Sequence, residues 1–353
     1  MSIVSSSYGQ AEPHHANARR AWRLAALVGL LLLLLLLQVA DGASALPLAQ
    51  LWQALGWPAS AEPLAVVVVW EIRLPRALLA VLVGMALGLA GAEMQTVLDN
   101  PLASPFTLGI ASAAALGAAL ALVWGWVIPG VPARWWVGAN AFVFAMAAAA
   151  VLDRVARWRQ LDGSAVVLFG IALVFACSAL VSLIQFTASA EALQGLVFWT
   201  LGSLDRADWP GVLLLALALV LVLPWAWQRA WALTALRLGE ERAASLGVAV
   251  QRERLAALAR VSVLAGLAVA TAGTIGFVGL VAPHIARRWF GEDHRWFLPA
   301  SAVVGGVLLS LAALAARHVI PGITLPVGIV TALVGVPVFV AVIFRQARRG
   351  THG

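Results

Sequence analysis

The chain has 353 residues, of which 62% are hydrophobic and 11% are charged. Soluble domains carry about 25% charged residues, so this composition excludes a water-facing globule. All 23 basic residues are arginine, which excludes a P-loop lysine and a Schiff-base lysine. Any ATP hydrolysis that drives this protein must therefore come from another polypeptide.

Apolar stretches recur along the whole sequence, and a membrane-spanning helix needs about 20 such residues. The sequence predicts an all-α polytopic membrane protein with about ten spanning helices. They cover residues 23–40, 77–98, 107–127, 136–152, 164–187, 210–227, 252–272, 276–288, 298–316 and 326–345. The eighth is short for a full span, which favours a re-entrant or bent element. Residues 23–346 then form one transmembrane domain between an N-terminal tail, 1–22, and a C-terminal tail, 347–353.

Arginine is distributed unequally between the two sides that alternate loops define. One side has Arg19, Arg20, Arg23, Arg154, Arg157, Arg159, Arg229, Arg237, Arg242, Arg252, Arg254, Arg260, Arg287, Arg288, Arg295, Arg345, Arg348 and Arg349, and the other has Arg73, Arg76, Arg134, Arg206 and Arg317. Cytoplasmic loops collect positive charge, so both termini are predicted in the cytoplasm. These arginines flank apolar stretches rather than exposed aromatic residues, which disfavours nucleic-acid binding.

Two connections are longer than the others. Residues 41–72 contain a predicted amphipathic helix, Leu48–Leu55, on the outer side, and residues 228–251 are the most polar part of the chain. The single cysteine, Cys177, lies within an apolar stretch and is predicted to be buried. A lone cysteine excludes disulfides and thiolate clusters, and the chain has no H-E-x-x-H motif, so no metal site is predicted.

Arg73 and Arg76 stand on the outer side, against the positive-inside bias, in the sequence W-E-I-R-L-P-R that begins the second helix. Pro75 suits the first turn of a helix, where its missing N–H costs nothing. Snorkelling to the membrane surface explains such arginines. Docking to an acidic partner on the outer side is the alternative. Arg317, at the outer end of the ninth helix, is a third candidate.

Two cytoplasmic connections have unusual sequences. Residues 99–109, D-N-P-L-A-S-P-F-T-L-G, contain no arginine, and their two prolines fix the backbone. This loop is either a constriction across a pathway or a plain tight turn. Residues 238–248 predict a short helix bounded by Gly239 and Gly247. Its mixed charge is typical of a solvated surface and equally of a helix that binds a partner protein.

Together these segments resemble the permease subunits of the ABC importers for vitamin B12, haem and iron siderophores, over residues 24–345. The resemblance depends on I-R-L-P-R at 72–76, Gln95 with N-P-L-A at 100–103, the L-G pairs at 238–239 and 246–247, and G-F-V-G-L with P-H within 276–284. Each marker is weak alone, but four in register are specific.

The resemblance implies a homodimer in a bacterial inner membrane, with the pathway between its two copies. It also implies two ATPase subunits beneath the dimer and a periplasmic binding protein above it. It implies no cofactor in this chain, because ATP and Mg²⁺ bind to the ATPase subunits. Arg73, Arg76 and Arg317 would dock the binding protein. The ATPase would bind the segment that contains Gly239, Glu240, Glu241, Arg242, Ser245, Leu246 and Gly247.

By the same resemblance, a cytoplasmic gate forms from Asn100 and Leu102 with Gly163 and Ser164 at the start of the fifth helix. The vitamin B12 permease has two hydroxyl residues where this chain has Gly163 and Ser164, which predicts a different gate shape. Glu93 is another departure, because the family has an uncharged residue there. An acid inside a span is costly and often functional. Glu93 therefore either lines the pathway or is neutral or hydrogen-bonded to a neighbouring helix.

The fifth helix has few polar residues, namely Ser178, Ser182, Gln185 and Thr187. Such a lining suits passage of a bulky chelate that the binding protein holds tightly. Because iron siderophores are the commonest cargo of the family, the resemblance implies an iron chelate, either a ferric siderophore or haem, with cobalamin as the alternative. The alternative of a different class is an ion-coupled secondary transporter, for which Glu93 is the one clear acid within a span.

Overall fold

The structure, a computed structural model, describes residues 12–42, 46–132, 135–159, 163–320 and 322–350. Within these ranges the chain forms helices and one isolated bridge, between Ile320 and Ile323, but no named strand. The ten predicted spans correspond to α1 (Glu12–Ala40), α4 (Leu74–Val97), α5 (Ile110–Trp124), α6 (Trp136–Arg159), α7 (Gly163–Phe186), α9 (Trp209–Gln228), α12 (Val250–Ala272), α13 (Val278–Phe290), α14 (His294–His318) and α15 (Val327–Gly350). The all-α prediction is confirmed.

The spans differ in length. In the described ranges, seven helical segments are long and apolar enough to cross a bilayer. α5 has 15 residues and α13 has 13, fewer than a full span needs. The prediction that the eighth element is short is therefore confirmed. Arg134, one of the five outer arginines, lies outside the described residues.

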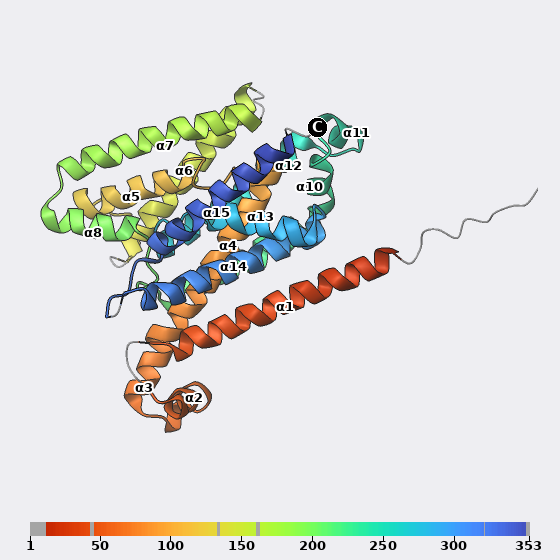
Figure 1. Cartoon of the computed structure of the whole chain (residues 1–353). Helices are drawn as coiled ribbons and strands as arrows, with labels where there is room; N and C mark the ends of the chain where they lie inside the picture. Colours follow the sequence, from red (N-terminus) through yellow and green to blue (C-terminus); the bar gives the residue numbers. More distant parts are fainter. Residues whose placement is uncertain (1–11, 43–45, 133–134, 160–162, 321, 351–353) are drawn as a thin grey trace, which may run out of the picture.

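α4 is the central helix and packs against α14, α12, α13 and α9 (Figure 1). Glycines let neighbouring backbones approach closely, as is common between membrane helices. A Cβ atom on Gly84 would lie 2.3 Å from the carbonyl oxygen of Gly305 in α14. A Cβ atom on Gly91 would lie 1.7 Å from the carbonyl oxygen of Gly279 in α13. We call this backbone contact of α4 with α13 and α14 the glycine seam.

The second span extends further outward than the sequence predicts. Pro75 lies in the first turn of α4, as expected, but the chain is already helical in α3 (Pro63–Val67) and in a π-helical turn (Val68–Arg73). Together with α4 these form one helical segment of 35 residues. The predicted helix at Leu48–Leu55 is present as α2 (Leu48–Gly56), which packs against α3.

α5, α6, α7 and α8 (Ala190–Thr200) form a group beside the core (Figure 1). The sequence does not predict α8, because 11 residues are too few for a span. Its start is nevertheless marked by Ser189, whose hydroxyl accepts a hydrogen bond from the N–H of Ala192. Cys177 in α7 is 5% exposed, so its predicted burial is confirmed.

Two short helices, α10 (Ala230–Leu236) and α11 (Glu240–Ser245), connect α9 to α12. They lie at one end of the bundle, and α2 and α3 lie at the opposite end (Figure 1). The end with α2 and α3 also contains Arg73 and is the one that arginine distribution predicts to face outward. The α10 and α11 end is then predicted to face the cytoplasm.

Candidate functional site

The three arginines predicted to dock a partner come together, although Arg317 is far from Arg73 and Arg76 in sequence. Arg73 is 4% exposed, and its Nη1 donates to the carbonyl oxygens of Val39 at 3.1 Å and Ala40 at 2.9 Å. Arg317 is close enough to act electrostatically on both Arg73 and Arg76. Arg73 therefore braces the end of α1 from within the protein, and its docking role stays a prediction.

Arg76 and Arg317 are already paired within the chain. Arg76 Nη2 lies 2.5 Å from Asp205 Oδ1, and Arg317 Nη1 lies 3.4 Å from Asp41 Oδ2. Both aspartates are more exposed than the arginines that they pair with. A docking partner with acidic side chains would therefore compete with these aspartates for the two arginines.

The loop after α4 has a rigid conformation. Asn100 Oδ1 accepts a hydrogen bond from the N–H of Leu102 at 2.9 Å, which closes an Asx turn. Further along, the loop contacts α7, since a Cβ atom on Gly170 would lie 2.6 Å from Leu108. Ser164 is exposed and lies nearly two helical turns before Gly170. The loop thus contacts α7 further along the helix than the predicted gate position at Gly163 and Ser164. The gate role of these residues stays a prediction.

The short helix predicted within 238–248 is confirmed as α11. Gly239 and Gly247 flank it with φ angles of 97° and 84°, a region that glycine adopts without steric cost. Ala243 is buried against the protein, and Leu238 and Leu246 are 54% and 51% exposed. The helix therefore presents two apolar side chains together with exposed charges, which is the composition of a small protein-binding surface.

Five residues form a chain of polar contacts at this end of the bundle. Arg237 Nη1 lies 2.5 Å from Asp99 Oδ1, and Arg237 Nε lies 3.4 Å from Glu292 Oε2. Glu292 Oε1 lies 3.0 Å from Arg287 Nε, and Arg287 Nη1 donates to Gln95 Oε1 at 3.3 Å. We call these five residues the ionic chain.

The ionic chain connects the two predicted functional segments of the cytoplasmic end. Arg237 immediately precedes residues 238–248, the segment predicted to bind the ATPase. Asp99 immediately precedes Asn100 of the predicted gate loop. The sequence gives no signal for this contact, because 138 residues separate the two partners.

His294, the first residue of α14, ties three helices together beside the ionic chain. Its buried ring lies 2.8 Å (Nε2) from Thr96 Oγ1 in α4 and 3.1 Å (Nδ1) from Thr234 Oγ1 in α10. Both hydroxyls also donate to a carbonyl one turn back, on Ala92 and Ala230. A neutral imidazole donates from one nitrogen and accepts at the other. The threonine that donates to the accepting nitrogen must give up its hydrogen bond to the carbonyl, because a hydroxyl has one proton. These bonds hold α10, and with it α11, against the core.

Comparison with known proteins identifies the family. The sequence matches the FecCD transport family over residues 30–345. The chain belongs to this family. The hemin transport system permease HmuU of Yersinia pestis is 38% identical over 279 residues, which cover 79% of this chain and 84% of HmuU. The vitamin B12 import permease BtuC of Salmonella paratyphi A is 39% identical over 280 residues, with the same coverage of 79% and 84%.

A solved structure gives the same result for the fold. This FecCD permease is similar to a metal-chelate type ABC transporter in an inward-facing conformation, with a TM-score of 0.80 and 28% identity. The match covers 92% of this chain and 99% of the other. The chain is therefore the permease subunit of a type II ABC importer, a class that lacks an ATPase site and works with ATP-binding subunits and a substrate-binding protein. The alternative of an ion-coupled secondary transporter is wrong.

Glu93 of the FecCD permease is part of a buried ion pair. Arg260 Nη2 in α12 lies 2.6 Å from Glu93 Oε2, and Arg260 Nε donates to both carboxylate oxygens at 3.0 and 2.8 Å. Both side chains are at most 1% exposed. The guanidinium carbon also lies 4.9 Å from the ring centroid of Trp225 in α9. Glu93 is thus hydrogen-bonded to a neighbouring helix, and Arg260, assigned by sequence to the cytoplasmic side, lies inside the bundle.

α7 of the FecCD permease exposes most of its surface in the single chain. Phe175 and Phe186 are 71% and 89% exposed. Ser178 and Ser182, one helical turn apart, are exposed as well, and Gln185 is half-buried. This apolar face with a few hydroxyls matches the composition predicted for a pathway lining, and the role of these residues stays a prediction.

Proposed function

We propose that this permease moves an iron chelate, haem or a ferric siderophore, from the periplasm to the cytoplasm by alternating access between two identical copies. The observation that carries the proposal is the exposed face of α7, where Ser178 and Ser182 stand among large apolar side chains. Such a face binds a bulky chelate weakly enough for it to leave. Similarity to a hemin permease and to a metal-chelate type transporter supports this cargo.

Cobalamin is the second candidate cargo, and the similarity to BtuC favours it. The two candidates differ in a direct assay: uptake of labelled haem, ferric siderophores and cobalamin into cells that lack this chain, with and without a copy supplied in trans. We expect the supplied copy to restore uptake of an iron chelate. Restoration of cobalamin uptake alone would contradict the proposed cargo and leave the importer class intact.

The proposed orientation puts the substrate-binding protein over the outer arginines and both termini in the cytoplasm. Complementary charges across an interface set orientation and encounter rate more than affinity, and we assign this role to Arg76 and Arg317. Arg73 would support them from beneath, because it is buried. A topology reporter that places residue 317 inside the cell would contradict this orientation.

We place the ATPase contact at α11, because it combines the exposed Leu238 and Leu246 with the exposed charges of Glu241 and Arg242. Glu241→Arg is expected to abolish co-purification of the ATPase subunit, since a reversed charge at a docking helix costs several kcal/mol. Glu62→Arg, the same change at an exposed site on the opposite side, is the matched control. Equal recovery of the ATPase with both variants would rule out α11 as the contact.

The ionic chain would transmit movement of α11 to the gate loop. Arg237→Asp is expected to lower the substrate taken up per ATP hydrolysed by about fivefold, the size of effect that a coupling of ~1 kcal/mol produces. The variant with both Arg237→Asp and Asp99→Arg restores opposite charges across this contact and is expected to recover part of the loss. Failure of the double variant to improve on Arg237→Asp, with both variants folded and ATP-hydrolysing, would show that the contact is only structural.

A further inference from the structure

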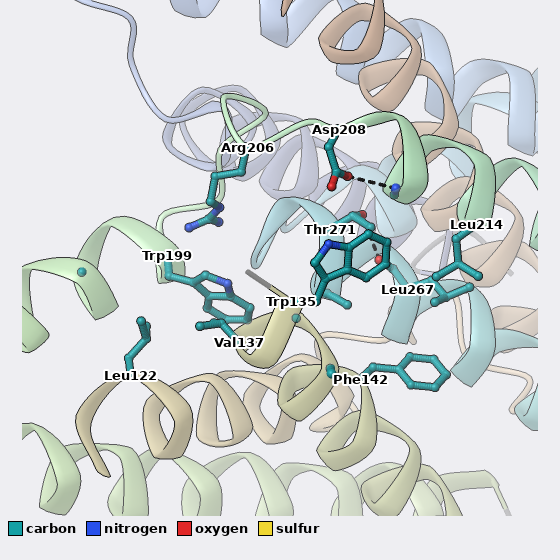
Figure 2. A pocket seen from close by; sticks show the side chains of 15 residues that line it. Leu122, Trp135, Val137, Phe142, Trp199, Arg206, Asp208, Leu214, Leu267 and Thr271 are labelled. Atoms are coloured by element: carbon teal, nitrogen blue, oxygen red, sulfur yellow. Dashed lines mark hydrogen bonds between the residues drawn. The ribbon is translucent and has the colours of Figure 1, made fainter. Parts of the chain in front are cut away.

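A cavity of about 550 Å³ lies between α6, α8, α9 and α12 (Figure 2). It is at the outer end of the permease, because the start of α9 is bound there. Trp209 Nε1 donates to the carbonyl oxygen of Trp70 at 2.9 Å, and Asp205, four residues before Trp209, pairs with Arg76. The volume is within the range of about 300–1,000 Å³ in which proteins bind small molecules.

The cavity has an apolar wall and a charged edge. Side chains of Leu122, Val137, Phe142, Leu214 and Leu267 form the wall. In Figure 2, Arg206 and Asp208 lie along one edge, with Trp199 below Arg206 and the apolar side chains on the opposite side. The Arg206 guanidinium carbon lies 6.0 Å from the ring centroid of Trp199. An amphiphile fits this division, because its apolar part would enter the cavity and its polar part would stay at the edge.

Among the described residues that line the cavity, two are charged, and these two are of opposite sign and form no ion pair with each other. Asp208 Oδ1 accepts a hydrogen bond from the N–H of Gly211 and caps α9. Asp205, the carboxylate next to Arg206 in sequence, binds Arg76. Burial lowers the pKa of Arg206, so water does not fully solvate this guanidinium. One cationic and one anionic group therefore face the same opening.

The surroundings of the cavity indicate which amphiphile reaches it. Leu213 and Leu217 on α9 are 62% and 56% exposed, as is typical of a surface that contacts lipid chains. Gly195 of α8 lines the cavity and has no atom within 4 Å of the position of a Cβ, so open space remains there. Tryptophans such as Trp135 and Trp199 are common at the level of lipid headgroups.

We infer that this cavity is a binding site for a phospholipid of the outer leaflet with a zwitterionic headgroup. The phosphate would bind Arg206, the ammonium group would bind Asp208, and an acyl chain would occupy the apolar wall. Phosphatidylethanolamine has this combination of groups. Phosphatidylglycerol has the phosphate but no ammonium group, so it would leave Asp208 without a counter-charge.

The test measures lipids retained by the purified full-length permease in detergent, by native mass spectrometry, after addition of equal amounts of phosphatidylethanolamine and phosphatidylglycerol. Wild-type protein should retain phosphatidylethanolamine preferentially. Arg206→Gln should lower retention about fivefold, the contribution of one arginine near a charged headgroup. Asp208→Asn should shift the preference to phosphatidylglycerol, while its side chain still caps α9 as well as aspartate does.

Gly195→Leu places a bulky apolar side chain in the cavity and should lower the amount of retained lipid. This variant tests the cavity without altering a charge. Helix propensity favours this change, so the variant is expected to fold. Arg295→Gln, an exposed arginine at the opposite end, is the matched control and should retain lipid like the wild type. Unchanged retention in Gly195→Leu, or equal retention of both lipids by the wild type, would overturn the inference. Displacement of the lipid by haem or cobalamin would overturn it too, because the cavity would then be a cargo site.

Discussion

Replacing Glu93 by glutamine should destabilise the permease by about 3–5 kcal/mol, because the buried Arg260 cation would lose its counter-charge. Glu93 and Arg260 are both almost completely inaccessible, and water cannot replace the missing carboxylate. The expected observation is a large drop in the thermal unfolding temperature of the purified protein in detergent. Arg260→Gln should have a similar effect, since it leaves a buried carboxylate unpaired.

A double variant separates stability from transport. Glu93→Leu combined with Arg260→Met removes both charges, and replacing a whole buried pair by apolar residues is often neutral or stabilising. We expect this variant to unfold near the wild-type temperature and to take up substrate with an unchanged pH profile. Loss of uptake in a stable double variant would instead assign Glu93 a role in transport. Full stability of Glu93→Gln alone would contradict the ion pair.

Gly91→Ala is expected to cost about 3 kcal/mol or more, because even one methyl group overfills a packed contact that has no flexible side chain to move. The added carbon would lie 1.7 Å from the carbonyl oxygen of Gly279, which belongs to the backbone of α13. Expression level and monodisperse elution from a size-exclusion column would report the loss of folded protein. Gly84→Ala, at 2.3 Å from the carbonyl oxygen of Gly305, should behave in the same way.

Gly29→Ala is the matched control for the glycine seam. Gly29 lies inside α1, and no atom is within 4 Å of the position of its Cβ. Alanine favours the helix by up to about 1 kcal/mol over glycine, so this variant should be as stable as the wild type or slightly more stable. If Gly91→Ala and Gly29→Ala unfold at the same temperature, the close approach of α4 to α13 is not present in the protein.

The sequence predicts the long spans well, because a helix that crosses the bilayer needs about 20 apolar residues whatever it packs against. The apolar stretches of the sequence are enough to locate these helices. Short helices need other information: α11 is recognisable from Gly239 and Gly247, whereas α8 has only the weak signal of Ser189. The outward extension through α3 and the π-helical turn is equally hidden, because Pro75 marks a helix start even where helical backbone precedes it.

Pairings across the bundle could not be predicted, because they depend on which helices are neighbours. Glu93 and Arg260 are 167 residues apart, and the sequence shows the acid without its partner. The pairing of Arg237 with Asp99 could not be predicted for the same reason. Arg73 illustrates the opposite case: its unusual position was recognised, but its burial beneath the end of α1 follows only from the three-dimensional structure.

The carbonyl oxygens of α13 and α14 occupy the places where α4 has no side chains, so a shift of α4 along these helices would bring its side chains against peptide groups. Packed interfaces of this kind resist gradual deformation. During a transport cycle α4, α13 and α14 would have to travel as a single rigid body. The movement that opens and closes access would then be made by α5, α6, α7 and α8 relative to this body. Their contact with the core includes the packing of α6 against α12.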